Sequence, residues 1–230
     1  MTPDDAYLAD PGLAKARHLQ RAGQWGAALE LIDGNASELR AEILVERHVF
    51  RLDPVDEAVE AVDAIAGTAL ATLLKAQLEY WRQLFTLDGE PIMDDPVAGF
   101  ARAAQDARLA GWATFHGAIA TENLHDDGVN SAAGYQRAAR FARDTGDVFL
   151  ESYVVRHQGD QAINREGDRE RGIALLRRSL QLRAALGARP QVAAAQIALA
   201  GELPAGPEAD ELREIGRRTA RELGIPWLSE

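Results

Sequence analysis

The sequence predicts an all-α fold in which about six antiparallel helical hairpins stack in order along the chain. A segment at residues 23–29 (Gly-Gln-Trp-Gly-Ala-Ala-Leu) returns in altered form at residues 167–173 (Gly-Asp-Arg-Glu-Arg-Gly-Ile), each time between two amphipathic segments. Apolar residues recur with a helical period, and no segment shows the strict alternation, rich in β-branched residues, that is typical of strands. Such hairpins leave apolar faces that only a stacked neighbour can cover.

Helix starts can be located from three Asp-Pro pairs: Asp10-Pro11, Asp53-Pro54 and Asp95-Pro96. An aspartate can cap the first turn, and proline is tolerated at the first helical position because its missing N–H would be unpaired there anyway. Residues 88–94 are the least regular segment and predict a surface loop, or a mild boundary at 88–95 within a single domain of residues 1–230. The predicted helices cover residues 11–22, 24–33, 36–51, 54–66, 69–87, 96–110, 112–126, 131–145, 147–165, 168–186, 190–202 and 207–223.

Two segments resemble the turn and second helix of a tetratricopeptide repeat (TPR): Gly23, Trp25, Ala28 and Leu29 in one, and Gly167, Asp168, Ile173, Leu176 and Leu180 in the other. In the second copy Gly172 occupies the small position, which indicates a close approach of two helices. Residues 35–145 match only as helical pairs. The resemblance implies a TPR-like, right-handed α-solenoid with drifted repeats, whose first helices line a groove for a peptide, a partner protein or a small molecule.

Composition excludes several classes of function. The 230 residues include 25 basic and 36 acidic side chains, a formal charge of −11, which opposes binding to nucleic acid or to an anionic membrane. Cysteine is absent, so disulfides, thiolate nucleophiles and cysteine-ligated metals are excluded, and no cofactor is expected. The N-terminal residues show neither a basic region nor an apolar run, so the expected location is cytoplasmic.

The predicted helix 147–165 carries the main candidate ligand-binding face. One side is apolar, whereas the other mixes an aromatic side chain with hydrogen-bonding groups and few full charges, which is the chemistry of ligand pockets. The alternative to a ligand-binding face is a helix face that is simply exposed to solvent. The candidate residues are Tyr153, His157, Asp160, Gln161 and Asn164.

Glu122 and His125 extend this candidate site. They lie on the predicted helix 112–126, the first helix of the preceding hairpin. A repeat offset of about 35 residues brings Glu122 opposite His157 and His125 opposite Asp160. Glu-x-x-His also occurs in di-iron helical bundles, but these need a second copy of the motif, which the sequence lacks. No metal site is therefore predicted, and a hydrogen-bonded or solvent-facing arrangement is favoured.

Polar residues in two other helices allow alternative interpretations. Gln77 interrupts the apolar stripe of helix 69–87, and its amide is expected to bond a neighbouring backbone group rather than face a cavity. Tyr80 and Trp81 in the same stripe are expected in the core. Glu38, Glu42 and Glu46 follow one side of helix 36–51; this spacing favours a solvated acidic strip over a pair of buried carboxylates in acid–base chemistry.

No sequence motif for a catalytic site is present, so no catalytic residue is assigned. The predicted function is a binding module with a concave groove for a peptide or partner protein, basic segments being favoured by the negative charge. The alternative is a small-molecule sensor or enzyme, with His157 as acid or base and Glu122 or Asp160 orienting it. A capped cavity of a few hundred cubic ångströms beside His157 would favour this alternative.

The apolar segment at residues 225–228, Ile-Pro-Trp-Leu, carries one further prediction. It either caps the last hairpin or docks on another copy of the chain. A homo-oligomer therefore remains one of the expected assemblies.

Overall fold

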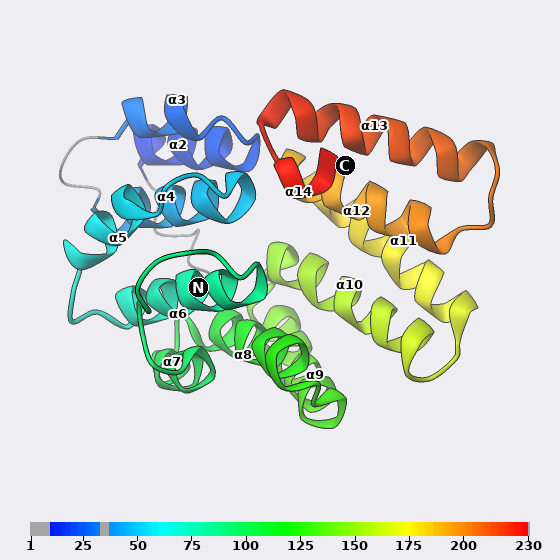
Figure 1. Cartoon of the computed structure of the whole chain (residues 1–230), viewed down its shortest axis with the longest axis horizontal. Helices are drawn as coiled ribbons and strands as arrows, with labels where there is room; N and C mark the ends of the chain where they lie inside the picture. Colours follow the sequence, from blue (N-terminus) through cyan, green and yellow to red (C-terminus); the bar gives the residue numbers. More distant parts are fainter. Residues whose placement is uncertain (1–9, 33–36, 230) are drawn as a thin grey trace.

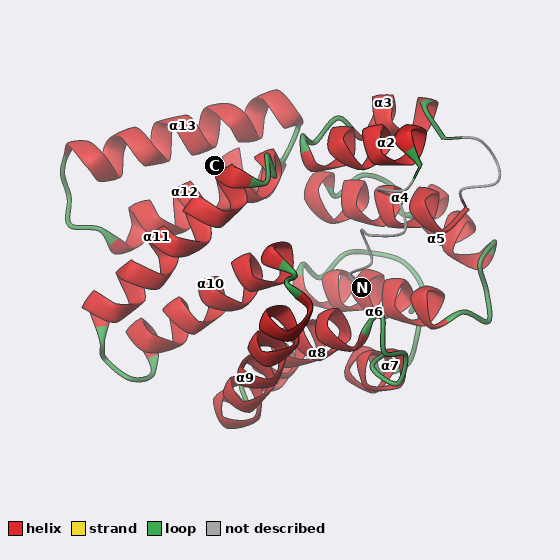
Figure 2. Cartoon of the chain, turned by 180° about the vertical axis from the view of Figure 1, so that it is seen from behind, coloured by secondary structure: helices red, strands yellow, loops and turns green. Residues whose placement is uncertain are grey.

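The computed structural model describes residues 10–32 and 37–229, and within these ranges the chain is all-α, without strands (Figures 1 and 2). None of the described helices has the length and apolarity needed to cross a lipid bilayer. The helices are α2 (Pro11–Arg21), α3 (Trp25–Glu30), α4 (Ser37–Arg51), α5 (Asp56–Asp63), α6 (Ala69–Leu84), α7 (Pro96–Ala103), α8 (Ala110–His125), α9 (Gly128–Thr145), α10 (Val148–Asn164), α11 (Arg169–Ala185), α12 (Arg189–Glu202), α13 (Pro207–Leu223) and α14 (Pro226–Ser229).

Two of the three predicted Asp-Pro caps are confirmed. Asp10 accepts hydrogen bonds from the backbone at the start of α2, and Asp95 accepts one from Ala98 N at the start of α7. The prediction for Asp53 is wrong, because α5 begins at Asp56. The Asp53 carboxylate instead forms an ion pair with Arg47 of α4, with 2.9 Å between Oδ2 and Nε.

The predicted helix positions otherwise agree with the structure within the described residues. The helix predicted over 96–110 ends at Ala103, because residues after it form turns; Asp106 Oδ1 accepts a hydrogen bond of 2.8 Å from Arg108 N there. The short α14 was not predicted. Residues 33 and 36, at the ends of two predicted helices, lie outside the described residues.

Consecutive helices pack in pairs, from α2 with α3 to α12 with α13, and each pair contacts the next. The first helices of neighbouring pairs also contact each other: α4 contacts α6, α6 contacts α8, and α8 contacts α10. Gly172 lets α10 and α11 approach each other closely: a Cβ atom placed there would lie 2.8 Å from the carbonyl oxygen of Gly159. The close approach predicted for Gly172 is therefore confirmed.

The N-terminal and C-terminal helices pack against each other, so the chain of helices closes on itself (Figure 1). A hydrophobic cluster joins Trp25 and Ile43 from the first two pairs with Leu223 and Ile225. Arg51 Nε donates a hydrogen bond of 3.1 Å to the carbonyl of Leu223. The segment 225–228 thus packs on the first helices of its own chain. A larger hydrophobic core is formed by residues of α4 to α10.

Candidate ligand-binding cavity

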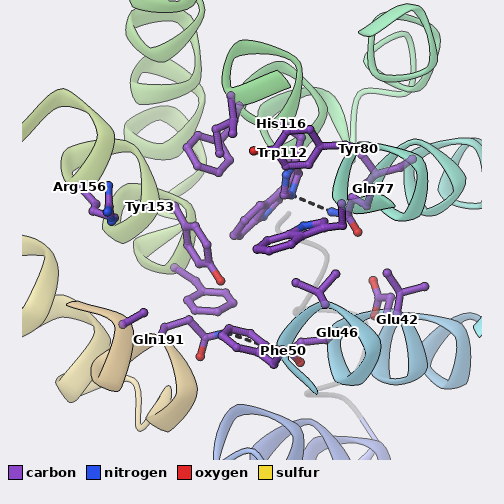
Figure 3. A pocket seen from close by; sticks show the side chains of 18 of the residues that line it. Glu42, Glu46, Phe50, Gln77, Tyr80, Trp112, His116, Tyr153, Arg156 and Gln191 are labelled. Carbon is purple, nitrogen blue, oxygen red and sulfur yellow. Dashed lines mark hydrogen bonds between the residues drawn. The ribbon is translucent and has the colours of Figure 1, made fainter. Parts of the chain in front are cut away.

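A central cavity of about 520 Å³ lies inside the circuit of helices (Figure 3). Its lining comes from the first helix of every pair, namely α2, α4, α6, α8, α10 and α12, together with α14 and one residue of α11. The surface of the walls is mostly apolar and aromatic, and the polar groups among the lining residues include four arginines and three carboxylates. This combination is typical of sites that enclose a small ligand and fix its orientation.

The α6 wall of the cavity is apolar. Tyr80 and Trp81, which were expected in the core, both line the cavity while packing against neighbours. Burial raises the pKa of Tyr80 to about 12, and its hydroxyl oxygen accepts a hydrogen bond of 2.6 Å from Asn123. The apolar α6 residues that line the cavity beside them are Leu70, Leu73, Leu74 and Leu84.

Gln77 faces the cavity rather than bonding a backbone group, so the favoured prediction for its amide is wrong. Its Nε2 lies 2.7 Å from His116 Nε2 (Figure 3). The amide nitrogen can only donate, so His116 Nε2 is the acceptor and the proton of the neutral ring is on Nδ1. Burial lowers the pKa of His116 to about 4, which keeps the ring neutral at physiological pH. The Gln77 amide thus binds a side chain of the neighbouring helix α8 and not a backbone group.

His157 lines the cavity and is held by a hydrogen-bond chain through Tyr135 to Glu122. The Tyr135 hydroxyl donates to Glu122 Oε2 at 2.6 Å and lies 3.4 Å from His157 Nδ1. Because the hydroxyl has one proton, its oxygen must accept from His157 Nδ1–H, which leaves the lone pair on Nε2. Glu122 thus reaches His157 through an intervening tyrosine that the sequence analysis did not identify.

The electrostatic surroundings of His157 keep it neutral. Burial, with the positive charges of Arg156 and Arg183, holds its pKa well below 6.5. Burial also raises the pKa of Tyr135 far above its ordinary value, and the adjacent Glu122 adds to this rise. The Nε2 atom of His157 can therefore accept a hydrogen bond from a ligand without carrying a charge.

The other predicted site residues on α10 have different positions: Tyr153 lines the cavity, Gln161 is buried behind it, and Asn164 is exposed. Tyr153 lines the cavity, with its ring 5.3 Å from that of Trp112, and burial raises its pKa to about 12. Gln161 is buried and donates to Glu122 Oε1 at 3.2 Å and to Ser131 Oγ at 3.1 Å, so it supports the hydrogen-bond chain. Asn164 is exposed at the end of α10.

His125 and Asp160 do not form the predicted pair among the described contacts. Asp160 binds Arg156, four residues earlier on α10. His125 is exposed at the end of α8, outside the central cavity. The simple repeat offset fails here because Asp160 is already engaged on its own helix.

Glu42 and Glu46 line the cavity, so the expectation of a solvated acidic strip is wrong for them (Figure 3). Glu42 binds Arg17 of α2. Glu46 Oε1 accepts a hydrogen bond of 2.8 Å from Gln191 Nε2 of α12. Burial raises the pKa of Glu46, against the opposing effects of Gln191 and other polar neighbours. A sequence signal existed: Val45 and Val49 share this face and also line the cavity.

Arg183 is the cavity residue that sequence reasoning missed most clearly. It belongs to α11, only 2% of its surface is exposed, and its guanidinium lies 4.7 Å from the centre of the Tyr153 ring. Its Nη1 donates to the backbone carbonyl of Gln191 at 3.0 Å. Burial lowers its pKa to about 10, so the side chain still carries a positive charge at physiological pH. No sequence signal separates it from the exposed arginines of the same helix.

Comparison with protein-family models, with characterised proteins and with solved structures gave no match. The cavity and the residues that line it are therefore the features of this chain that indicate a function.

Proposed function

We propose that this protein binds a small molecule in its central cavity, and that its scaffold is a TPR-like, right-handed α-solenoid whose two ends meet. The order of the helices supports the scaffold, since the first helix of each successive pair lines the inside, as expected for stacked helical repeats. The two segments at residues 23–29 and 167–173 add the resemblance of their turns.

The single observation that carries the proposal is a cavity of about 520 Å³ with His157 in its wall. Pockets for small ligands usually have volumes of about 300–1,000 Å³ and mostly apolar walls with a few polar groups. A peptide groove needs an open channel in which an extended chain can enter and leave. Contact between the first and last helices replaces the long groove of an open solenoid, in which an extended peptide would lie, with a central cavity, and this favours a small ligand over a peptide.

A ligand screen on the intact protein tests this function. Trp81, Trp112 and Trp227 line the cavity, so intrinsic tryptophan fluorescence should change when a ligand binds. We expect a library of metabolites to yield compounds that bind with one-to-one stoichiometry in calorimetry and raise the melting temperature, because binding to the folded state stabilises it.

Two matched variants locate the binding. Ala198 lines the cavity, so Ala198→Trp should fill part of it and weaken binding at least 10-fold (about 1.4 kcal/mol). Ala174 is exposed on α11, so Ala174→Trp should leave binding unchanged. Equal affinities in the two variants, or a screen in which only peptides bind, would argue against the proposed function.

A further inference from the structure

The cavity contains a buried cation, Arg183, with which no carboxylate of the described residues forms an ion pair. The structure brings no described carboxylate within ion-pairing distance of Arg183, and its Nε is buried without a hydrogen-bond partner in the described chain. Burying an uncompensated charge is costly, and proteins usually avoid it by pairing. The hydrogen-bond acceptor that it has among the described residues, the carbonyl of Gln191, carries no full negative charge.

A second arginine makes this side of the cavity more positive. Arg156 lines the cavity from α10, and its positive charge contributes to lowering the pKa of both His157 and Arg183. Its partner Asp160 does not line the cavity. We call Arg156 and Arg183 the cationic wall; the neutral ring of His157 lines the same side of the cavity.

The carboxylates that line the cavity are committed elsewhere. Glu42 binds Arg17, and Asp147 accepts a hydrogen bond of 3.0 Å from Trp112 Nε1 while also capping α10. Glu46 is bound by Gln191, and burial favours its neutral form. The positive charge of Arg183 is thus left for an anion from outside the chain.

The α6 wall of the cavity carries no charged side chain. It supplies four leucines together with Trp81, and Figure 3 shows Gln77 and Tyr80 of this helix across the cavity from Tyr153 and Arg156. A ligand that spans the cavity therefore meets charge at one end and apolar surface at the other.

We propose that the ligand is an organic carboxylate with an apolar body, whose carboxylate binds Arg183 and whose body lies against the α6 wall. This inference rests on the proposed function and narrows it to one chemical class. Arginine suits a carboxylate because its planar fork presents two parallel donors. A phosphate monoester shares the anionic chemistry, but its second charge would have to be balanced by Arg156, which Asp160 already pairs.

Calorimetry with matched probes tests the ligand class on the intact protein. Three carboxylates, octanoate, decanoate and 3-phenylpropionate, are each compared with the corresponding primary amide and with octyl phosphate. We expect at least one carboxylate to bind at least 10-fold more tightly than its amide, the usual effect of one charge-assisted hydrogen bond. Octyl phosphate should bind more weakly than octanoate.

Substitutions at Arg183 identify the residue responsible. Arg183→Met should abolish the preference for carboxylate over amide while leaving the melting temperature unchanged or higher, because it removes an unpaired buried charge. Arg183→Lys should keep part of the preference, since it retains charge without the fork. Arg178→Gln, on the exposed side of α11, should change neither quantity and serves as the control.

The outcomes separate this inference from the proposed function. If no carboxylate binds more tightly than its amide, or if the preference persists in Arg183→Met, the carboxylate inference is overturned. A neutral or cationic metabolite that binds in the cavity, with loss of binding in Ala198→Trp, would retain the proposed function and reject the carboxylate. A tighter complex with octyl phosphate would assign the cationic wall to phosphate esters instead.

Discussion

Trp227 Nε1 donates a hydrogen bond of 2.9 Å to the backbone carbonyl of Phe50, and the two rings stack with their centres 6.0 Å apart. This contact joins the last described helix to α4. The centre of the Trp227 ring also lies 5.8 Å from that of Trp81, and both rings line the cavity. Trp227 thus both joins the two ends of the chain and forms part of the cavity wall. Closure of the circuit and the shape of the cavity therefore depend on the same side chain.

Trp227→Ala should lower the free energy of unfolding by about 2 kcal/mol or more, because it removes the ring contacts and the hydrogen bond together. Trp227→Phe keeps an aromatic ring and should cost about 1 kcal/mol, the usual value of one hydrogen bond. Urea unfolding followed by circular dichroism measures both. Wild-type stability in Trp227→Ala would mean that α14 does not hold the circuit closed.

The sequence predicts local structure well and closure poorly, for physical reasons. Helix positions follow from periodicity and caps, which act within a few residues. The contact between Phe50 and Trp227 spans 177 positions, and no local signal encodes it. Asp53 shows the same limit on a smaller scale, because its cap position was lost to an ion pair with Arg47.

The candidate site was predicted in part, and the errors run in both directions. Tyr153 and His157 lie in the cavity wall, whereas Asn164 and His125 are exposed. Glu46 was expected in solvent because a polar stripe on an amphipathic helix usually faces water. In a closed circuit the inner stripe faces the cavity instead, so polarity alone does not distinguish an inner from an outer helix face.

Glu46→Gln should stabilise the protein at neutral pH. The pKa of Glu46 is raised in the folded state, so folding favours the protonated carboxyl. Wild-type stability is therefore highest below the unfolded-state pKa of about 4.5 and is lost as the pH rises through the raised pKa. The uncharged amide avoids this loss, and the two proteins should differ most at about pH 7–8 and least near pH 4.5.

Thermal unfolding across this pH range measures the difference. Glu60→Gln, at an exposed position of α5, is the matched control and should stay within about 0.5 kcal/mol of wild type throughout. A stability difference for Glu46→Gln that grows as the pH falls would contradict the assignment of a buried carboxyl favouring its neutral form.

Glu79→Gln should have the opposite dependence on pH. Glu79 is fully buried, and its burial, which opposes the charge, is outweighed by hydrogen bonds from Arg82, Gln83 and the backbone of Ile92, so its pKa is lowered. The carboxylate stabilises the fold above the unfolded-state pKa of about 4.5, and this contribution is lost as the pH falls through the lowered pKa. At pH 7 we expect Glu79→Gln to cost about 1–3 kcal/mol.

The measurement is chemical unfolding of wild type and Glu79→Gln at several pH values from about 7 down to 4, near the unfolded-state pKa. The stability gap between the two proteins should narrow toward the acid end. A gap of constant size would show that the substitution acts through packing and not through the charge. Because Glu79 Oε2 accepts from Ile92 N at 2.9 Å, residues around Ile92 should also become more sensitive to proteolysis.

Gly172→Ala tests the close contact between α10 and α11. The new Cβ would lie 2.8 Å from the carbonyl oxygen of Gly159, and backbone atoms cannot move aside as a flexible side chain can. Alanine stabilises a helix by about 1 kcal/mol relative to glycine, but separating α10 from α11 should cost about 1–3 kcal/mol, so the net change is destabilising.

Gly201→Ala is the matched control: Gly201 lies in α12 with no atom near the added Cβ, so the substitution should be stabilising by about 0.4–1 kcal/mol. Thermal unfolding of the two variants should give shifts of opposite sign, and a stabilised Gly172→Ala would mean that α10 and α11 do not meet at this glycine.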